Sequence, residues 1–394
     1  MQINLPPEVN SIIKTLSKAG HSSYAVGGCI RDSLMQIPPK DWDITTAALP
    51  NEIKKIFPHT VDTGIKHGTV TVLLANHPYE VTTYRIDGEY QDARRPEAVT
   101  FTDDIVKDLS RRDFTMNAIA YNPSTGLIDP YNGHQDIIQK NIRCVGHAPS
   151  RFGEDALRMM RAIRFSAQLS FNMDPETYQA ISPLAERLAL VSMERIREEL
   201  TKILSSQNPF ALLLLEETGL WPQILPKRDL QQAAKRLSKL QQKEPAMLYT
   251  FLLPDEAFMW HLKFDKRTIK ETMLYSEWLN KEIIPDRYQV KKALSQMGQR
   301  QFENLLILKY VLKDDQNLNE CRKLCRDIIE SGECYSLPDL AINGGDLIAV
   351  GIAPGEAMGA LIAKLLDKVM MEPGLNKKEI LTKLAIRLVS PSRA

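Results

Sequence analysis

The sequence lacks the marks of a membrane or secreted protein. No run of about 18 apolar residues occurs anywhere in it, so no membrane-spanning helix is expected. Its first residues, MQINLPPEVN, show no basic segment followed by an apolar core, so no signal peptide is predicted. Together these two absences favour a protein of the cytoplasm.

Cysteine and net charge are also scarce. Five cysteines are few and odd in number, which is typical of a reducing compartment with free thiols. Cys321 and Cys325 stand about one helical turn apart, but no histidine or cysteine pair at zinc-finger spacing accompanies them. We therefore predict thiols that pack a helix. The formal net charge of +1 excludes neither an RNA partner nor a small-molecule one, and it requires any basic surface to be local.

Strand and helix signals divide the chain into two parts. Before about residue 148, runs rich in β-branched residues alternate with short helical patterns, as in HGTVTVLL at 67–74 and YEVTTYRI at 79–86. After that point amphipathic helical patterns dominate and strand signals almost vanish. The sequence therefore predicts an α+β protein with a mixed head and a long helical remainder.

A pair of carboxylates, Asp41 and Asp43, lies in the stretch YAVGGCIRDSLMQIPPKDWDITT at 24–46. If residues 42–45 form a strand, its period of two puts both side chains on the same face. Two such carboxylates can hold a divalent metal beside a triphosphate. A D-x-D pattern alone is often a solvated surface pair. Here it follows a strand, two glycines and a helix, which favours metal-dependent phosphoryl or nucleotidyl transfer.

Residues around this pair extend the same interpretation. Gly27 and Gly28 would let the backbone approach phosphate closely, and Arg31 would supply a forked donor. Glu80, in the neighbouring predicted strand, is a candidate third carboxylate. An outward-facing strand residue or an arginine partner is an equally good interpretation of Glu80.

The segment RRDFTMN at 111–117 is the second cluster of interest. Arg111 and Arg112 beside Asp113 can contact triphosphate oxygens and a ribose hydroxyl. We expect them on a helix over 103–121, where such a cluster alone would more often be a solvated face.

The segment RFGEDALRMMRAIRF at 151–165 is the third cluster of interest. Asp155, Arg158, Arg161 and Arg164 recur at every third position, so they follow one slowly drifting face of a predicted helix. An aspartate accepts from an exocyclic amine, and an arginine one turn later donates to the adjacent ring nitrogen. Cytosine and adenine offer that pair, whereas uracil and guanine place a carbonyl and an N–H there. The pattern predicts selection of C and A without a nucleic-acid template.

Taken in order, the motifs GGCIRD, DWDI, RRDFTMNA, RFGEDALRMMRAIRF and MERIREEL resemble the class II tRNA nucleotidyltransferases, the CCA-adding enzymes related to bacterial poly(A) polymerases. The resemblance is strong up to about residue 200 and weaker to the end, where INGGDLIAVGIAPGEAMGALI resembles the tail of that family. It implies a polymerase-β-like nucleotidyltransferase head followed by helical domains. The implied ranges are 1–147 for the head, 148–205 for the neck with the base-recognition helix, 206–300 for the body and 301–394 for a tRNA-binding tail.

The resemblance also implies roles for single residues. Asp41 and Asp43 match the catalytic pair that binds the metal, expected to be Mg²⁺. Glu194 and Arg195 match the last head–neck motif, which has a structural role. The positions that match nucleotide-binding residues are Gly28, Arg31, Arg112, Asp113, Asp155, Arg158, Arg161 and Arg164.

The activity implied is template-independent addition of C, C and A to the 3′ end of tRNA from CTP and ATP. No membrane or DNA partner is expected. The loop at 87–95 matches the segment that family members need for the final A, which argues against an enzyme that adds only CC. An enzyme that adds only A and a poly(A) polymerase remain alternatives. So does a non-catalytic RNA-binding protein, although the presence of both Asp41 and Asp43 argues against it.

The last helical stretch carries basic residues that are candidates for contacts with tRNA phosphates. Each of them alone is more typical of a solvated face. They are Lys377, Lys378, Lys383 and Arg387.

Overall fold

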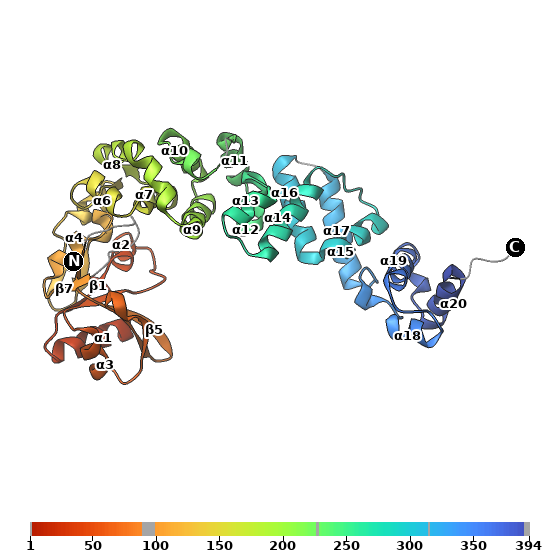
Figure 1. Ribbon diagram of the computed structural model, residues 1–394, viewed down its shortest axis with the longest axis horizontal. Helices are drawn as coiled ribbons and strands as arrows, with labels where there is room; N and C mark the ends of the chain where they lie inside the picture. Colours follow the sequence, from red (N-terminus) through yellow and green to blue (C-terminus); the bar gives the residue numbers. More distant parts are fainter. Residues whose placement is uncertain (1, 89–98, 226–227, 314–315, 390–394) are drawn as a thin grey trace. The chain divides into compact units, whose positions relative to one another are not determined.

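The computed structural model describes residues 2–88, 99–225, 228–313 and 316–389 (Figure 1). The chain forms two compact units, Met1–Ser238 and Lys239–Ala394. Most of the loop predicted at 87–95 to serve addition of the final A, residues 89–95, lies outside the described residues. The division at 147, 205 and 300 stays a prediction.

A seven-stranded sheet forms the centre of the first unit, in the strand order β3-β4-β5-β2-β1-β8-β9. β2 and β5 pair in parallel, and the other neighbours pair antiparallel. The strands are β1 (Ser23–Val26), β2 (Ile44–Thr46), β3 (Thr60–Gly64), β4 (Thr69–Leu74), β5 (His77–Thr83), β8 (Ala120–Asn122) and β9 (Gly126–Ile128).

The predicted pair of β-branched strands is confirmed as the hairpin β4–β5. Its register pairs Leu74 with His77, so Ala75 and Asn76 form a two-residue connection. Both residues have positive φ values, 50° and 63°, as the turn that matches strand twist requires. The hairpin holds Glu80 on the strand that pairs directly with β2.

Helices and two short two-stranded pairs form the rest of the described part of the first unit (Figure 1). The helices are α1 (Pro7–Lys18), α2 (Gly28–Leu34), α3 (Pro50–Ile56), α4 (Ile105–Ser110), α5 (Gly133–Ile138), α6 (Ala148–Glu154), α7 (Leu157–Leu169), α8 (Pro175–Gln179), α9 (Met193–Leu204), α10 (Leu213–Glu217) and α11 (Leu230–Leu237). The paired short strands are β6 (Arg85–Asp87) with β7 (Val99–Phe101), and β10 (Asn141–Ile142) with β11 (Asn172–Met173).

Two predicted helices are interrupted in the structure. The helix expected over 103–121 ends with α4 at Ser110, because Phe114 is extended, wholly buried and bridged to Cys144. The helix expected in the segment 151–165 breaks at Asp155, which is extended with φ −141°. Its carboxylate accepts from the Leu157 N–H at 3.1 Å, at the start of α7. Tertiary packing and a local cap therefore override helical periodicity at both places.

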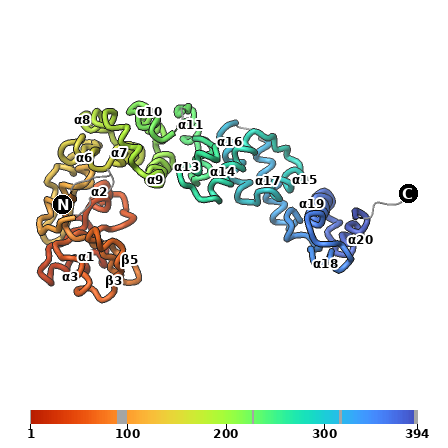
Figure 2. Tube along the Cα trace, in the orientation of Figure 1, coloured from red at the N-terminus to blue at the C-terminus, as the bar shows by residue number. Residues whose placement is uncertain are grey.

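The second unit is helical throughout its described part, as the trace in Figure 2 shows. Aspartates at 255, 265 and 286 accept from the first turns of α13, α14 and α15, which accounts for the sharp helix starts. The helices are α12 (Pro245–Leu252), α13 (Glu256–His261), α14 (Lys266–Leu279), α15 (Arg287–Met297), α16 (Gln299–Leu312), α17 (Gln316–Glu330), α18 (Gly344–Ala349), α19 (Glu356–Met371) and α20 (Lys378–Val389).

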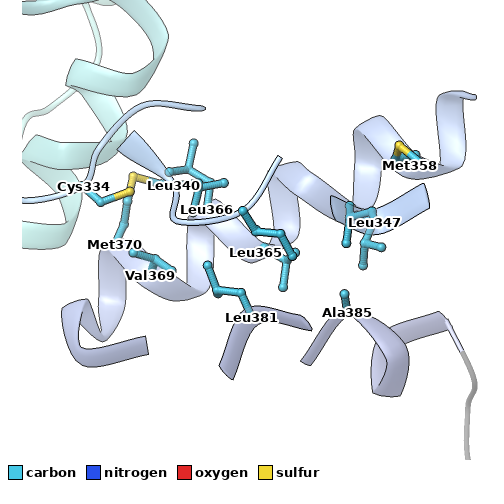
Figure 3. Close-up of a cluster of buried hydrophobic side chains, with 12 residues drawn as sticks. Cys334, Leu340, Leu347, Met358, Leu365, Leu366, Val369, Met370, Leu381 and Ala385 are labelled. Carbon is cyan, nitrogen blue, oxygen red and sulfur yellow. The ribbon is translucent and has the colours of Figure 1, made fainter. Parts of the chain in front are cut away.

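The end of this unit has its own apolar core, drawn in Figure 3. Leu365 and Val369 of α19 are fully buried there against Leu381 of α20 and Leu347 of α18. Burial of such residues stabilises a short helical segment that propensity alone would leave marginal.

The α+β class and the mixed head with a helical remainder are confirmed. All five cysteines are free, as predicted, and all are buried, including Cys321 and Cys325, which were expected to pack a helix. In the described residues no helix has both the length and the apolar character needed to cross a membrane.

Candidate active site

Asp41 and Asp43 lie just before β2, which begins at Ile44. The prediction of a strand over 42–45 is therefore wrong at its start. The Asp43 carbonyl still accepts from the Val26 N–H at 3.0 Å, so the backbone stays fixed beside β1. Both aspartates are exposed and line a cavity of about 730 Å³.

Glu80 lies in the same cavity. The parallel register of β2 and β5 pairs Ile44 with Val81. Asp43 and Glu80 each come one residue before this pair, on adjacent segments of the chain. Burial raises the pKa of the Glu80 carboxyl, and the charges of Asp43 and Asp41 raise it further. The structure thus supports the interpretation of Glu80 as a third carboxylate of this cluster.

The charges around Asp43 indicate what the cluster can bind. Reduced hydration in the cavity raises the pKa of the Asp43 carboxyl, Arg112 lowers it, and Asp41 raises it. Mutually repelling carboxylates at a solvent-accessible wall suit a cation. No three acidic, histidine or cysteine side chains in the described part enclose a metal position by themselves. A site with one or two carboxylates, water and substrate phosphates as ligands fits these residues.

The glycine turn lies next to the second cluster. Gly27 has φ +85°, and its N–H donates to the Ile119 carbonyl at 3.1 Å. A Cβ atom at Gly27 would lie 3.0 Å from Nη1 of Arg112. The positive φ favours glycine here, and the absent side chain leaves room for this guanidinium group.

A chain of hydrogen bonds joins the turn to the third cluster. Arg31 Nη1 donates to Asn117 Oδ1 at 2.8 Å, and Asn117 Nδ2 donates to Asp113 Oδ1 at 3.2 Å. Arg161 Nε donates to Asp113 Oδ2 at 2.7 Å. Burial alone would raise the pKa of the Asp113 carboxyl, but Arg161 and Arg158 hold it well below its usual range. Asp113 is therefore a fixed anion between two arginines, Arg158 and Arg161, that were predicted to bind the nucleotide.

Asp108 is a site residue that the sequence reasoning missed. Its side chain is fully buried, and Oδ1 accepts from Nε and Nη2 of Arg111 at 3.0 and 2.8 Å. Oδ2 lies 3.4 Å from Nη2 of Arg112. Burial opposes ionisation, yet the two arginines lower the pKa of Asp108. The signal in the sequence was an acid one helical turn before an arginine pair.

Two of the predicted base-recognition residues, Asp155 and Arg164, are held by partners outside their own segment. Asp155 accepts from Arg195 of α9, with Nη2–Oδ2 at 2.7 Å. Arg164 Nε lies 2.7 Å from Oε2 of the buried Glu199, also on α9. The motif MERIREEL therefore contributes two anchoring side chains, Arg195 and Glu199.

The Arg158 side chain is buried and is held by groups of its own segment and of the arginine pair. Its Nη1 donates to Glu154 at 2.6 Å, and its Nη2 donates to the Arg111 carbonyl at 3.0 Å. The structure thus brings Asp113 and Arg161 together, and the Arg158 N–H donates to the Asp155 carbonyl at 3.0 Å. The prediction that Asp155 shares a helix with the arginines is wrong, because α7 begins after it.

Three family models match successive parts of the chain. The poly A polymerase head domain matches residues 23–143, and the RNA- and SrmB-binding site of polymerase A matches 170–231. The tRNA nucleotidyltransferase domain 2 matches 237–385. The first match contains the carboxylate cavity, the glycine turn and the arginine pair.

Curated relatives cover the whole length. A CCA-adding enzyme of Lactiplantibacillus plantarum is 38% identical, over 99% of this chain and 98% of its own. A CCA-adding enzyme of Geobacillus stearothermophilus is 50% identical over 55% of this chain and 54% of its own. Identity is thus higher over part of the chain than over its full length.

Solved structures of CCA-adding enzymes are also similar to this chain. The Bacillus stearothermophilus CCA-adding enzyme in complex with CTP is 34% identical, has a TM-score of 0.83 and covers 98% of both chains. The Thermotoga maritima CCA-adding enzyme complexed with tRNA is 22% identical, with a TM-score of 0.62 over 99% of this chain and 100% of its own, and shows the fold alone. Given the identity along the full length, this chain belongs to the class II CCA-adding enzymes.

Proposed function

We propose that the chain adds C, C and A to the 3′ end of tRNA, using CTP and ATP and no nucleic-acid template. One arrangement carries the proposal. The Arg112 guanidinium lies against the Gly27 turn, and its charge reaches Asp43. A triphosphate at this point would meet carboxylates on one side and arginine donors on the other, which suits nucleotidyl transfer.

In this proposal Asp41 and Asp43 hold Mg²⁺, because two carboxylates completed by water and phosphate oxygens suit that ion. When bound, Mg²⁺ lowers the pKa of the attacking 3′-hydroxyl and stabilises charge on the transferred phosphate. The choice of Mg²⁺ over another divalent ion, and the cytoplasm as the compartment, are parts of the same proposal.

The arginine segment orients the nucleotide. Arg31 and Arg112 donate to triphosphate oxygens, and Gly28 allows the backbone to approach them. Asp113 accepts from the ribose hydroxyl, since an ionised carboxylate held by Arg161 keeps lone pairs available. The tRNA 3′-hydroxyl attacks the α-phosphate in line, and pyrophosphate leaves.

Base choice is assigned to Asp155 and Arg158, with Arg161 and Arg164 in support. Asp155 accepts from the exocyclic amine of C or A through lone pairs that its contact with Arg195 leaves available. Arg158 donates to the adjacent ring nitrogen. Because Arg158 also contacts Glu154 and the Arg111 carbonyl, nucleotide binding has to recruit a guanidinium that already has partners.

The helical remainder serves tRNA in this proposal, with the neck, body and tail at 148–205, 206–300 and 301–394. Lys377, Lys383 and Arg387 are proposed phosphate contacts, in keeping with the salt-dependent binding expected of RNA partners. Lys378 is a weaker candidate, because its Nζ lies 2.6 Å from Oδ1 of Asp346.

One experiment tests the activity as a whole. A tRNA lacking its 3′ CCA is incubated with the chain and Mg²⁺, and with CTP, ATP or both. We expect two added residues with CTP alone and three with both nucleotides. Addition of only CC when both nucleotides are present would indicate an enzyme that adds only CC. Addition of a single A to tRNA ending in CC, without any C addition, would indicate an enzyme that adds only A. A long ladder of added A residues would indicate a poly(A) polymerase. Binding of tRNA without extension would indicate the non-catalytic alternative.

A second experiment tests the metal assignment. Asp41→Ala should abolish incorporation of both nucleotides while tRNA binding is retained. Asp62→Ala is the matched control, since Asp62 lies in the same sheet and its carboxylate forms an ion pair with the exposed Lys54. Substantial residual activity in Asp41→Ala would refute the assignment.

A further inference from the structure

Three of the arginines assigned to the nucleotide surround one aromatic ring. The guanidinium carbon of Arg164 lies 4.0 Å from the ring centroid of Phe165, that of Arg31 lies 5.2 Å away, and that of Arg161 lies 5.6 Å away. Arg31 comes from α2, whereas the other two lie on α7, four residues and one residue before Phe165. The Phe165 ring is therefore a contact shared by α2, which follows the glycine turn, and α7, which carries the arginines assigned to base recognition.

The ring itself is fixed in place. Phe165 is 4% exposed, and its ring meets that of Phe114 edge to face, with centroids 5.7 Å apart and planes at 84°. Phe114 directly follows Asp113, the carboxylate that holds Arg161. A buried ring packed in this way cannot touch a nucleotide, so any effect it has on substrate must act through the arginines.

Three guanidinium groups around one point repel each other, and the structure offsets this repulsion in two ways. Each arginine has its own carboxylate: Asp32 for Arg31, Asp113 for Arg161 and Glu199 for Arg164. These carboxylates come from separate elements, and each forms an ion pair with one of the three arginines. The negative face of the Phe165 ring attracts guanidinium groups, and it is common to all three.

We propose that Phe165 is a positioning residue that sets the spacing of Arg31, Arg161 and Arg164 through cation–π contact. This inference rests on the proposed nucleotide site and deepens it, because it links the arginine at the triphosphate to those that support base recognition. A structural role alone would require only the volume and apolarity of the side chain. The proposed role requires the electron density of the ring.

Fluorination separates the two roles, since fluorine withdraws electron density from the ring face with little change of shape. Position 165 is replaced by 4-fluoro-, 3,5-difluoro- and 3,4,5-trifluorophenylalanine in the full chain. KM and kcat for CTP and ATP are measured on tRNA lacking its 3′ end, with equilibrium binding of CTP and the melting temperature. We expect KM and the CTP dissociation constant to rise stepwise, to about tenfold with three fluorines, while the melting temperature stays constant.

The matched control is the same series at Phe152, a fully buried ring of α6. Within the described residues Phe152 has no arginine or lysine over its ring, so its series should leave KM unchanged. Phe165→Leu, which keeps an apolar side chain and removes the ring, should raise KM at least as much as the trifluoro variant.

If KM and the CTP dissociation constant stay unchanged across the fluorinated series at position 165, the inference is wrong. This holds even if the melting temperature falls. If the unmodified chain binds CTP without extending tRNA, the proposed function fails and the binding series alone still decides the role of Phe165. If the unmodified chain binds no nucleotide, both proposals are wrong.

Discussion

Arg195 and Asp155, forty residues apart in the chain, meet through two hydrogen bonds of 2.7 and 3.3 Å that join both guanidinium ends to both carboxylate oxygens. The forked geometry fixes the carboxylate that we assign to the exocyclic amine of the base. Arg195→Lys keeps the charge and loses the fork. We expect discrimination of CTP over UTP to fall about tenfold, measured by competition for one tRNA acceptor.

The control for this prediction is Arg197→Lys, the same substitution on the same helix. It should leave the ratio of CTP to UTP incorporation unchanged. If Arg195→Lys lowers turnover with both nucleotides equally, Arg195 acts on the fold of the head–neck region and has no specific effect on base choice.

Asp108 is expected to control the orientation of Arg112. Asp108→Asn keeps the shape and replaces a charged acceptor with an amide whose N–H₂ end faces guanidinium donors. Loss of a hydrogen bond to a charged group costs about 1.5–3 kcal/mol, so we expect KM for both CTP and ATP to rise about tenfold or more. Asp103→Asn, at an exposed acid near the start of the same helix, is the control. An unchanged KM with a lower melting temperature would assign Asp108 to stability alone.

Gly133 is expected to tolerate no side chain. A Cβ atom there would lie 2.0 Å from the Thr115 carbonyl oxygen and 3.0 Å from a side-chain carbon of Ile119. Gly133→Ala should therefore destabilise the first unit by about 3 kcal/mol, as measured by thermal unfolding. Gly153→Ala, in α6 with no heavy atom within 4 Å of the added carbon, should be neutral or stabilising by up to about 1 kcal/mol. Equal melting temperatures for the two variants would contradict the packing argument.

Glu333 should make the second unit sensitive to acid. Hydrogen bonding from Arg287 lowers its pKa to about 2, with Lys291 adding to the effect, against an ordinary value of 4.5. Because the folded pKa is depressed, the stabilisation is complete above about 4.5 and is lost as the pH falls toward 2. Glu333→Gln should speed hydrogen exchange of α15 peptides at pH 6, and the difference from the unmodified chain should shrink at pH 3.

Glu277→Gln is the control for the acid experiment, since its ion pair with Lys281 is exposed and is expected to contribute little. It should leave exchange unchanged at both pH values, after correction for the intrinsic pH dependence of exchange. A difference for Glu333→Gln that stays constant between pH 6 and pH 3 would contradict the depressed pKa.

Sequence patterns predicted the parts of the site that are contiguous in the chain. The pairing of Asp41 with Asp43 and the glycine turn beside Arg31 could be recognised because local geometry determines their placement. The α+β class followed from the loss of strand patterns after the head. These inferences needed only periodicity and residue type.

The contacts between distant segments could not be predicted in this way. Nothing in the spacing of Arg164 and Glu199 indicates that they form a buried ion pair. The extended backbone at Asp155 interrupts a pattern that periodicity alone would continue as a helix. Phe165 was an apolar residue at a buried helical position, and its three cationic neighbours depend on how α2 packs near α7.

The order of strands in the sheet has a consequence for synthesis of the chain. β3, β4 and β5 pair with near neighbours, so this hairpin region can form early. β1 pairs with β8 through Ala25 with Tyr121, across most of the head. Such long-range pairing is slow to form, because the chain must lose the entropy of closing a long loop before the contacts between the strands stabilise it. During translation this edge of β1 therefore stays unpaired until β8 leaves the ribosome, and an unpaired strand edge can associate with another chain.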